Sequence, residues 1–326
     1  MIDSLPTAPP ATPSELAALR RALRLAARGR WQTSPNPMVG AVLLRDGVAV
    51  AEGWHRRVGG PHAEVEALRG VADARGTTMC VSLEPCAHHG RTPPCVEALI
   101  AAGIRRVVAC HRDPDPRVGG AGLARLAGAG IEVTAGYLVE EAVRLNWKYL
   151  TAKVHGRPAV TLKWAMSLDG KIATRGGDSR WISSDAARRW ALELRESHDA
   201  IVVGSGTVLA DDPLLTRRLG RAAGPILRVV LDRRLRLPSS ARLLDEAGPV
   251  LVYAAPAVAP GEGEATRAEA VAALARRGAE VATLPAVTPA AVLADLARRG
   301  VQSVLVEGGG EVLAAFVTAG AFDRVE

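Results

Sequence analysis

Apolar and polar positions in the first half of the chain alternate between helical and strand spacing. Residues 14–29 have apolar positions every three or four residues, which predicts a helix with Ser14 as its cap and Gly29 as its stop. Residues 38–54 contain two apolar stretches around an Arg-Asp-Gly turn, which predicts a hairpin. The other predicted elements are strands at 78–83, 105–110 and 131–136, helices that start near Ala63, Pro94 and Gly122, and a last helix from Leu138 to about Tyr149. This alternation of helices and strands predicts a three-layer α/β/α sandwich over residues 14–152.

A second alternating series starts at Pro158 and predicts another α/β domain over residues 158–326. Its predicted strands are 158–167, 199–206, 226–232, 250–255, 280–285 and 303–310, and its predicted helices are 183–197, 268–278 and 290–300. The polar segment 151–157, TAKVHGR, has neither pattern and is the predicted boundary. Residues 1–13 are Pro-rich and predict a flexible lead-in.

Composition is that of a globular protein, with 48% hydrophobic and 23% charged residues in a chain of 326. A chain of this length can bury two separate cores. It has no apolar run of membrane-spanning length, and its first residues lack the basic and apolar regions of a signal peptide. We therefore expect a cytoplasmic protein with no membrane partner.

The formal net charge is +7, which raises the question of a nucleic-acid partner. Nearly all of the basic residues are Arg, and they are spread over several predicted helices instead of forming one basic arm. We therefore expect a small phosphorylated molecule as the partner, and no nucleic acid.

Three residues of the first half have the types and contexts of zinc ligands. His62 follows a Gly-Gly-Pro turn and opens a predicted helix, Cys86 follows a predicted strand, and Cys95 begins the next helix. One His and two Cys suit tetrahedral zinc with a fourth position left for water. The other cysteines, Cys80 and Cys110, lie in apolar strands and are expected to be core residues.

Glu64, two residues after the histidine, distinguishes a hydrolytic zinc site from a structural one. A carboxylate there can take a proton from an activated water and return it to departing ammonia, and the H-x-E and P-C pairing is typical of zinc deaminases. One alternative is a nucleoside or tRNA deaminase with an unrelated second domain. Another is an RNA-binding or regulatory protein with a purely structural zinc, which would have no need of Glu64.

The two cysteines are separated by eight residues in PCAHHGRTPPC, whereas the usual deaminase spacing is two. With TSPNPMVGAV, GWHRRVGGPHAE and HRDPDP, this loop resembles the bifunctional riboflavin-biosynthesis family. That family joins a diaminohydroxyphosphoribosylaminopyrimidine deaminase to a 5-amino-6-(5-phosphoribosylamino)uracil reductase. The resemblance implies a cytidine-deaminase-like first domain, a small phosphorylated pyrimidine as substrate, and a homo-oligomer.

The same resemblance implies roles for individual deaminase residues. It assigns His62, Cys86 and Cys95 to one zinc ion per chain and Glu64 to catalysis, and it assigns substrate binding to Asn36, His55, His88, Arg91 and Asp113. Arg91 suits a phosphate, and His88 suits a donor beside the zinc. His89 and His111 match no role and are expected to be surface or structural residues.

Local signals for a dinucleotide in the second half are weak. Gly204-Ser205-Gly206 follows a strand, and residues 308–310 form a glycine turn between a strand and a helix, where a pyrophosphate could approach the helix N-terminus. Arg233 and Arg234 end the strand VVLD and either hold the 2′-phosphate of NADP or are simply solvated.

The segments LKWAMSLDGKIA, GDSRWISS and LVEGGGEVLAAF, with residues 187–218, resemble the reductase domain of the same family, which is similar in fold to dihydrofolate reductase. The resemblance implies NADPH as cofactor and hydride transfer to C1 of the ribosyl group. The implied NADPH contacts are Ala165, Trp181, Thr207, Asp211, Gly309, Gly310, Glu311, Val312, Leu313, Ala314 and Ala315. The implied substrate contacts are Lys163, Ser179, Arg195, Leu215, Arg218 and Glu307.

The sequence stops at AFDRVE, where members of the resembled family usually continue with further strands of the reductase sheet. We therefore expect the reductase domain of this chain to lack its last strands and to be weakened or prone to associate.

Overall fold

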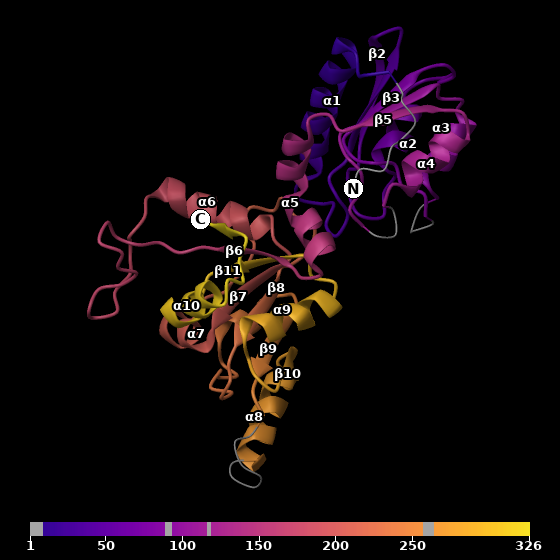
Figure 1. Ribbon diagram of the computed structural model, residues 1–326. Helices are drawn as coiled ribbons and strands as arrows, with labels where there is room; N and C mark the ends of the chain where they lie inside the picture. The colour runs from indigo at the N-terminus through magenta and orange to yellow at the C-terminus, as the bar shows by residue number, and fades with distance from the viewer. Residues whose placement is uncertain (1–8, 89–92, 116–118, 257–263) are drawn as a thin grey trace. The chain divides into compact units, whose positions relative to one another are not determined.

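The computed structural model describes residues 9–88, 93–115, 119–256 and 264–326 (Figure 1). The chain divides into two compact units, Met1–His155 and Gly156–Glu326. Most of the predicted boundary segment 151–157 is helical, because helix α5 (Val139–His155) continues to His155. The predicted end of that helix near Tyr149 is therefore too early.

The first unit contains helices on both sides of one sheet. Its elements are α1 (Pro13–Ala26), the 3₁₀ helix η1 (Ala27–Gly29), β1 (Gly40–Arg45), β2 (Val48–Trp54), α2 (Ala63–Leu68), β3 (Thr78–Val81), α3 (Cys95–Ala101), β4 (Arg106–Ala109), α4 (Ala121–Gly128), β5 (Glu132–Ala135) and α5. In the described residues the sheet has five strands in the order β2-β1-β3-β4-β5. Strand β1 is antiparallel to β2 and β3, whereas β3, β4 and β5 are parallel.

Alternating strand residues give this sheet two buried faces. Leu43, Met79 and Val107 pack with α2, α3 and α4 in one cluster. Cys80 and Val108, their neighbours along the same strands, point the other way and pack with α1 and α5. The predicted three-layer sandwich is thus confirmed, and Cys80 and Cys110 are core residues as expected.

Helix α1 begins with Thr12, not Ser14, as its N-cap. The Thr12 hydroxyl accepts a hydrogen bond from the Glu15 backbone N–H, and the Glu15 carboxylate accepts one from the Thr12 N–H. The guanidinium of Arg106 pairs with Glu15 at 2.8 Å and also donates to the carbonyl of Pro9. Residues 9–12, which the sequence suggested as part of a flexible lead-in, are therefore held against the sheet.

The second unit is built on a parallel sheet. Its elements are β6 (Ala159–Leu162), α6 (Asp185–Glu196), β7 (Ala200–Gly204), α7 (Ser205–Asp211), β8 (Leu227–Leu231), the 3₁₀ helix η2 (Arg242–Leu244), β9 (Val250–Ala254), α8 (Glu264–Arg276), β10 (Ala279–Thr283), α9 (Pro289–Arg298), β11 (Ser303–Val306), α10 (Gly310–Thr318) and β12 (Arg324–Val325). Among described residues the sheet has seven strands in the order β10-β9-β8-β7-β11-β6-β12, and all of the recorded pairs are parallel.

Strand order decides where this second unit can bind a ligand. Strands β6, β7 and β11 are neighbours, so their carboxyl ends meet at one edge of the sheet. Ligands of open parallel sheets bind at that edge, where the loops diverge. The residues that follow these three strands are therefore the first candidates for a site.

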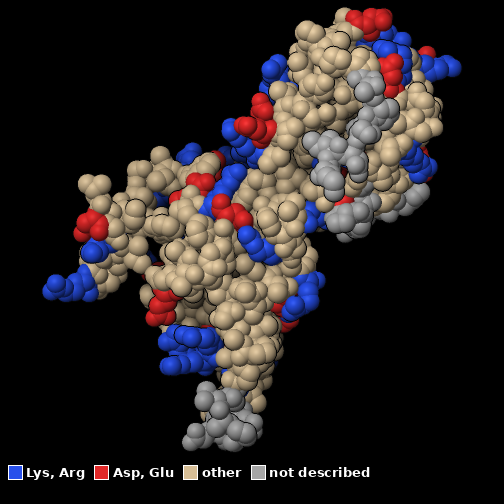
Figure 2. All heavy atoms as spheres, in the orientation of Figure 1, with Lys and Arg blue, Asp and Glu red and all other residues tan. Residues whose placement is uncertain are grey.

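Surface charge does not form one extended basic area on the face that Figure 2 shows, where blue and red side chains lie in separate small groups. No helix of the described residues is both long and apolar enough to cross a membrane.

Candidate functional site

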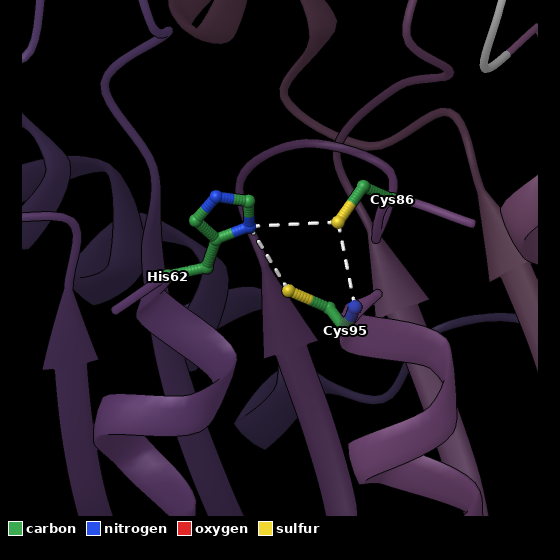
Figure 3. A group of neighbouring side chains, drawn as sticks. All are labelled: His62, Cys86 and Cys95. Carbon is green, nitrogen blue, oxygen red and sulfur yellow. Dashed lines mark hydrogen bonds between the residues drawn. The ribbon is translucent and has the colours of Figure 1, made fainter. Parts of the chain in front are cut away.

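His62, Cys86 and Cys95 meet in the first unit, although they come from three separate segments (Figure 3). His62 is the N-cap residue of α2, Cys95 is the first residue of α3, and Cys86 lies in the loop after β3. Their ligand atoms all lie within 4.8 Å of one another. The structure thus brings together the three residues that the sequence predicted as zinc ligands.

The contacts within this cluster favour negative charge on the sulfur of Cys86. The Nδ1 atom of His62 lies 3.1 Å from Cys95 Sγ and 3.5 Å from Cys86 Sγ, and the Cys95 backbone N–H donates to Cys86 Sγ at 3.4 Å. Hydrogen bonding from the Cys95 thiol and from His62 lowers the pKa of Cys86 to about 4. The same bond to Cys86 raises the pKa of the Cys95 thiol. A divalent cation would stabilise both sulfurs as thiolates, so the donor set fits zinc.

A close contact between α2 and β2 brings His55 and Asn36 to this cluster. A Cβ on Gly53 would lie 2.3 Å from the Ala63 carbonyl oxygen, so glycine lets the start of α2 approach β2. The rings of His55 and His62 then meet edge to face at 5.3 Å.

His55 is buried and hydrogen-bonded at both ring nitrogens. Its Nδ1 contacts the Pro61 carbonyl oxygen at 2.9 Å, and its Nε2 contacts Asn36 Nδ2 at 3.1 Å. Burial lowers the pKa of His55, so the neutral ring donates from Nδ1 and accepts from the Asn36 amide at Nε2. Asn36 therefore has its carboxamide fixed beside the zinc cluster.

Glu64 is buried at the start of α2, with 3% of its surface exposed. Burial raises the pKa of this carboxyl to about 7. A group with a pKa near neutrality can both take up and release a proton at low cost. Glu64 is next to the three ligand atoms without being needed as a fourth ligand.

Asp113 is buried and is held by hydrogen bonds to other groups of the first unit. Its carboxylate accepts from the Tyr149 hydroxyl at 3.0 Å, and its backbone N–H donates to Glu84. His88 Nδ1 and His111 Nε2 are buried without a described hydrogen-bond partner. Arg91 and His89 lie outside the described residues.

The second unit has a cavity of about 680 Å³ at the sheet edge where β6, β7 and β11 end. Of the predicted NADPH contacts, Ala165, Trp181, Thr207, Asp211, Gly309 and Leu313 line it. Of the predicted substrate contacts, Lys163, Ser179, Arg195, Arg218 and Glu307 line it. Leu215 is absent from this lining, because its side chain is buried in the core.

Charged groups at the bottom of this cavity form a compact network. The guanidinium of Arg195 donates to both carboxylate oxygens of Glu307 at 2.9 Å, and Lys163 Nζ lies 3.9 Å from the same carboxylate. Burial opposes ionisation of Glu307, but its bonds from Arg195 dominate and lower its pKa. The positive charge of Arg195 is thus balanced by Glu307, whereas Arg218 is exposed to solvent.

The glycine turn before α10 packs tightly against the first residues of α10 and of α7. A Cβ on Gly308 would lie 2.6 Å from Val312 Cβ, and the Gly309 N–H donates to Thr207 Oγ1 at 3.0 Å. These contacts keep the N-terminus of α10 open at the cavity edge, where backbone N–H groups suit a pyrophosphate.

A second cavity of about 360 Å³ lies on the other side of this turn, at the end of β8. Arg233, Arg234 and Arg236 line it, as do three of the predicted cofactor contacts, Glu311, Val312 and Ala315. Gly310 and Ala314 line neither cavity.

Sequence analysis missed some residues that shape these sites. The carboxylate of Glu84 accepts hydrogen bonds from the backbone N–H groups of Asp113, Gly120, Gly122 and Leu123, and Arg188 stacks on Trp181 at 4.4 Å. Glu84 lies two residues before Cys86, just outside the quoted motif, and its partners are backbone groups of a distant loop. Nothing in the spacing of Arg188 indicated its partner.

Comparisons with known proteins identify both halves of the chain. Residues 13–111 match the cytidine and deoxycytidylate deaminase zinc-binding region, and residues 158–326 match the RibD C-terminal domain. The riboflavin biosynthesis protein RibD of Bacillus amyloliquefaciens is 44% identical over 311 residues, which cover 94% of this chain and 82% of that protein. The chain belongs to the RibD family.

Solved structures of RibD proteins agree with this assignment. Acinetobacter baumannii RibD, form 1, is 38% identical with a TM-score of 0.86, over 96% of this chain and 85% of that one. A diaminohydroxyphosphoribosylaminopyrimidine deaminase and 5-amino-6-(5-phosphoribosylamino)uracil reductase from Thermotoga maritima is 38% identical with a TM-score of 0.81, over 94% and 84%. The prediction of a riboflavin-pathway enzyme with a zinc-binding deaminase domain and an NADPH-dependent reductase domain is confirmed.

Proposed function

We propose that the chain carries out two consecutive reactions on one small phosphorylated pyrimidine. The first unit deaminates 2,5-diamino-6-(5-phosphoribosylamino)pyrimidin-4(3H)-one, and the second reduces the ribosyl group to give 5-amino-6-(5-phosphoribitylamino)uracil. The observation that carries the first reaction is the His62, Cys86 and Cys95 cluster with buried Glu64 beside it.

In the first reaction, His62, Cys86 and Cys95 are the residues that hold the metal. A zinc ion in this ligand set supplies an activated water. Glu64 moves one proton of the water to the ring nitrogen and the other to the amine, so that a C–O bond forms, the C–N bond breaks and ammonia leaves. Asn36, fixed by His55, hydrogen-bonds to the pyrimidine ring. His88, Arg91 and Asp113 complete the proposed substrate contacts.

In the second reaction, the cavity at the end of β6, β7 and β11 holds the ribosyl group near the cofactor. When bound, NADPH would supply the hydride that is added to C1 of the ribosyl group, while the bond from C1 to the ring oxygen breaks and that oxygen takes up a proton. Lys163 and Glu307 face the cavity and can hydrogen-bond to sugar hydroxyls, and Arg218 is the better placed arginine for the phosphate. Ser179 and Leu215 remain proposed substrate contacts, Leu215 through its backbone.

The domain limits and the assembly are also proposals. Residues 14–152 and 158–326 are the proposed deaminase and reductase domains, which the two family matches support. Leu168 and Trp190 are large apolar side chains exposed on the second unit, which supports a homo-oligomer. Light scattering of the purified protein tests this.

Supplying the diaminopyrimidinone ribotide with and without NADPH tests the proposed reactions. Without NADPH we expect one ammonia per substrate and the deaminated ribosyl product, and with NADPH the ribityl product and NADP⁺. Cytidine and adenosine are the control substrates. Deamination of either control in place of the ribotide would disprove the proposed specificity.

The second cavity supports a preference for NADPH over NADH. Arg233 and Arg234 follow β8 and line this cavity beside the α10 turn. A cofactor with its pyrophosphate at the start of α10 would place its 2′-phosphate there. We therefore expect Arg233→Ala with Arg234→Ala to raise the KM for NADPH about tenfold or more, since charge-assisted bonds to the 2′-phosphate are lost. The KM for NADH should change little. Arg276→Ala, an exposed arginine of α8, is the matched control.

A further inference from the structure

Helix α5 contains a buried asparagine that interrupts it. Asn146 has φ −102° and ψ 19°, outside the helical range, and only 3% of its surface is exposed. Asparagine disfavours helix interiors because its carboxamide competes for backbone hydrogen bonds. A buried asparagine at a helix kink therefore needs an explanation outside the helix.

The partner of this side chain is the backbone of Met38. The Met38 N–H donates to Asn146 Oδ1 at 2.8 Å, and Asn146 Nδ2 donates to the Met38 carbonyl oxygen at 2.8 Å. One carboxamide thus satisfies both polar groups of Met38, as a neighbouring strand would. Pro35 and Pro37 have no backbone N–H group. Met38 is therefore the first residue after Asn36 that offers both a backbone N–H and a carbonyl oxygen for hydrogen bonds.

Met38 belongs to the segment that carries Asn36 into the deaminase site. The Asn36 amide donates to His55, and the His55 backbone N–H donates to the Val39 carbonyl oxygen. Residues 36–39 are therefore held by β2 through His55 and by α5 through Asn146. A displacement of Met38 would move Asn36 relative to His55 and so relative to the zinc ligands.

The rest of α5 holds this arrangement in place. Tyr149 and Leu150 form a buried cluster with Leu83 and Val39, and the Tyr149 hydroxyl donates to Asp113. The helix after the kink thus contacts the segment of Asn36, the strand end that leads to Cys86 and the loop of Asp113. Among the described contacts of α5, only those of the Asn146 carboxamide are hydrogen bonds to Met38.

We propose that Asn146 is a positioning residue for deamination. Through its two hydrogen bonds to Met38, it sets the place of Asn36 in the pyrimidine site. This inference rests on the proposed function, and on Asn36 as a contact to the base.

Kinetics of Asn146→Leu, a replacement of similar size, test the proposal. We expect the KM for deamination to rise about tenfold and kcat to change less than about threefold, because binding geometry is lost while Glu64 and the ligands remain. Zinc content and the reductase reaction with the already deaminated substrate should stay unchanged; the first reports on folding of the first unit and the second on folding of the second unit. Asn146→Asp keeps the acceptor for the Met38 N–H and should give a smaller rise, so it serves if Asn146→Leu fails to fold.

A double-mutant cycle shows whether Asn146 acts through Asn36. In an Asn36→Ala background, Asn146→Leu should raise KM by less than about twofold further, because the group that it positions is gone. Tyr149→Phe is the matched control, since it removes a bond from the same helix to a different loop, and its effect should multiply with that of Asn36→Ala.

Two results would overturn the inference. In the first, the increases in KM caused by Asn146→Leu and Asn36→Ala multiply in full in the double variant, or Asn146→Leu lowers kcat at constant KM. Asn146 would then be a purely structural residue, and the proposed function would stand. A wild-type protein that releases no ammonia from the ribotide would remove the proposed function, and this inference with it.

Discussion

At the scale of single residues, Glu64 shows how position decides the chemistry of a carboxyl group. Glu15 is also buried, but it is paired with Arg106 and stabilises the start of α1. Glu64 is buried next to a histidine and two sulfurs, and burial raises its pKa to about 7. The first carboxylate therefore serves the structure through its contacts, whereas the second can exchange a proton.

Changing Glu64 to Gln is expected to lower the deamination rate by about 10²- to 10⁴-fold, since the shape is kept and the proton acceptor is lost. Zinc should remain bound, because Glu64 is not among the three proposed ligands. Ammonia release and metal analysis on the same sample measure both effects. Near-normal deamination by this variant would refute the mechanism, and its reductase reaction is the internal control.

Glu196 gives a pH-dependent test in the second unit. Burial alone would raise the pKa of Glu196, but the backbone N–H groups of Ala222, Leu219 and Arg221 outweigh it and lower the pKa. A carboxyl whose pKa is lowered by folding stabilises the fold above its unfolded-state pKa and loses this effect as pH falls through the folded value. These bonds also fix the loop that carries Arg218.

We therefore expect Glu196→Gln to lower the unfolding temperature of the second unit by about 3–6 °C at pH 7, and by less below the ordinary carboxyl pKa. Thermal unfolding at pH 7 and at pH 4 measures the difference. Glu193→Gln, on the same helix and paired with Arg221 near the surface, should have a smaller effect at both values. A Glu196→Gln effect that does not shrink in acid would contradict this account.

At the scale of helices and strands, the sequence predicted elements better than their ends. The helix start at Thr12 was missed because Pro13 and Glu15 complete a capping box that outweighs the nearby Ser14. Strand β6 ends at Leu162, earlier than predicted, because the chain turns toward the cavity at Lys163 and Trp164. Helix α5 continues through the polar segment, where Lys153 pairs with Asp115, a contact that depends on the tertiary structure.

The same distinction holds for the candidate sites. Residues in motifs at element ends, such as His62, Cys86 and Cys95, were predicted as a group and lie together. Leu215 was assigned by resemblance alone, and its side chain is in the core. Asn146 and Glu84 could not be found from local pattern, because their partners are backbone groups of distant segments.

The turn before α10 allows a prediction at this scale. Gly308→Ala should raise the KM for NADPH about fivefold or more, because its Cβ would overlap Val312 and displace the start of the helix. The change should leave deamination intact. Val312→Gly in the same chain removes the Cβ and both Cγ atoms that the new methyl group would meet, and it should restore much of the loss. No recovery in the double variant would mean that this contact does not set the turn.

At the scale of the whole molecule, the two reactions can be separated by metal removal. We expect the purified protein to hold about one zinc per chain, and a chelator to abolish deamination, because only the first unit has a His and Cys cluster among described residues. NADPH oxidation with the deaminated substrate should persist. Loss of both activities at equal chelator concentration would show that the metal also supports the second unit.

The strand order of the second unit has a consequence for its synthesis on the ribosome. Strand β6 is the first strand of its sheet to be made, yet its partners are β11 and β12. The sheet of the first unit, β1 to β5, is complete by then and can form during translation. From Ala159 until Ser303–Val306 emerges, the nascent chain therefore carries an apolar, unpaired strand beside an already folded domain. Slowed elongation between these two points should increase aggregation and chaperone binding, whereas slowed elongation before Ala159 should not.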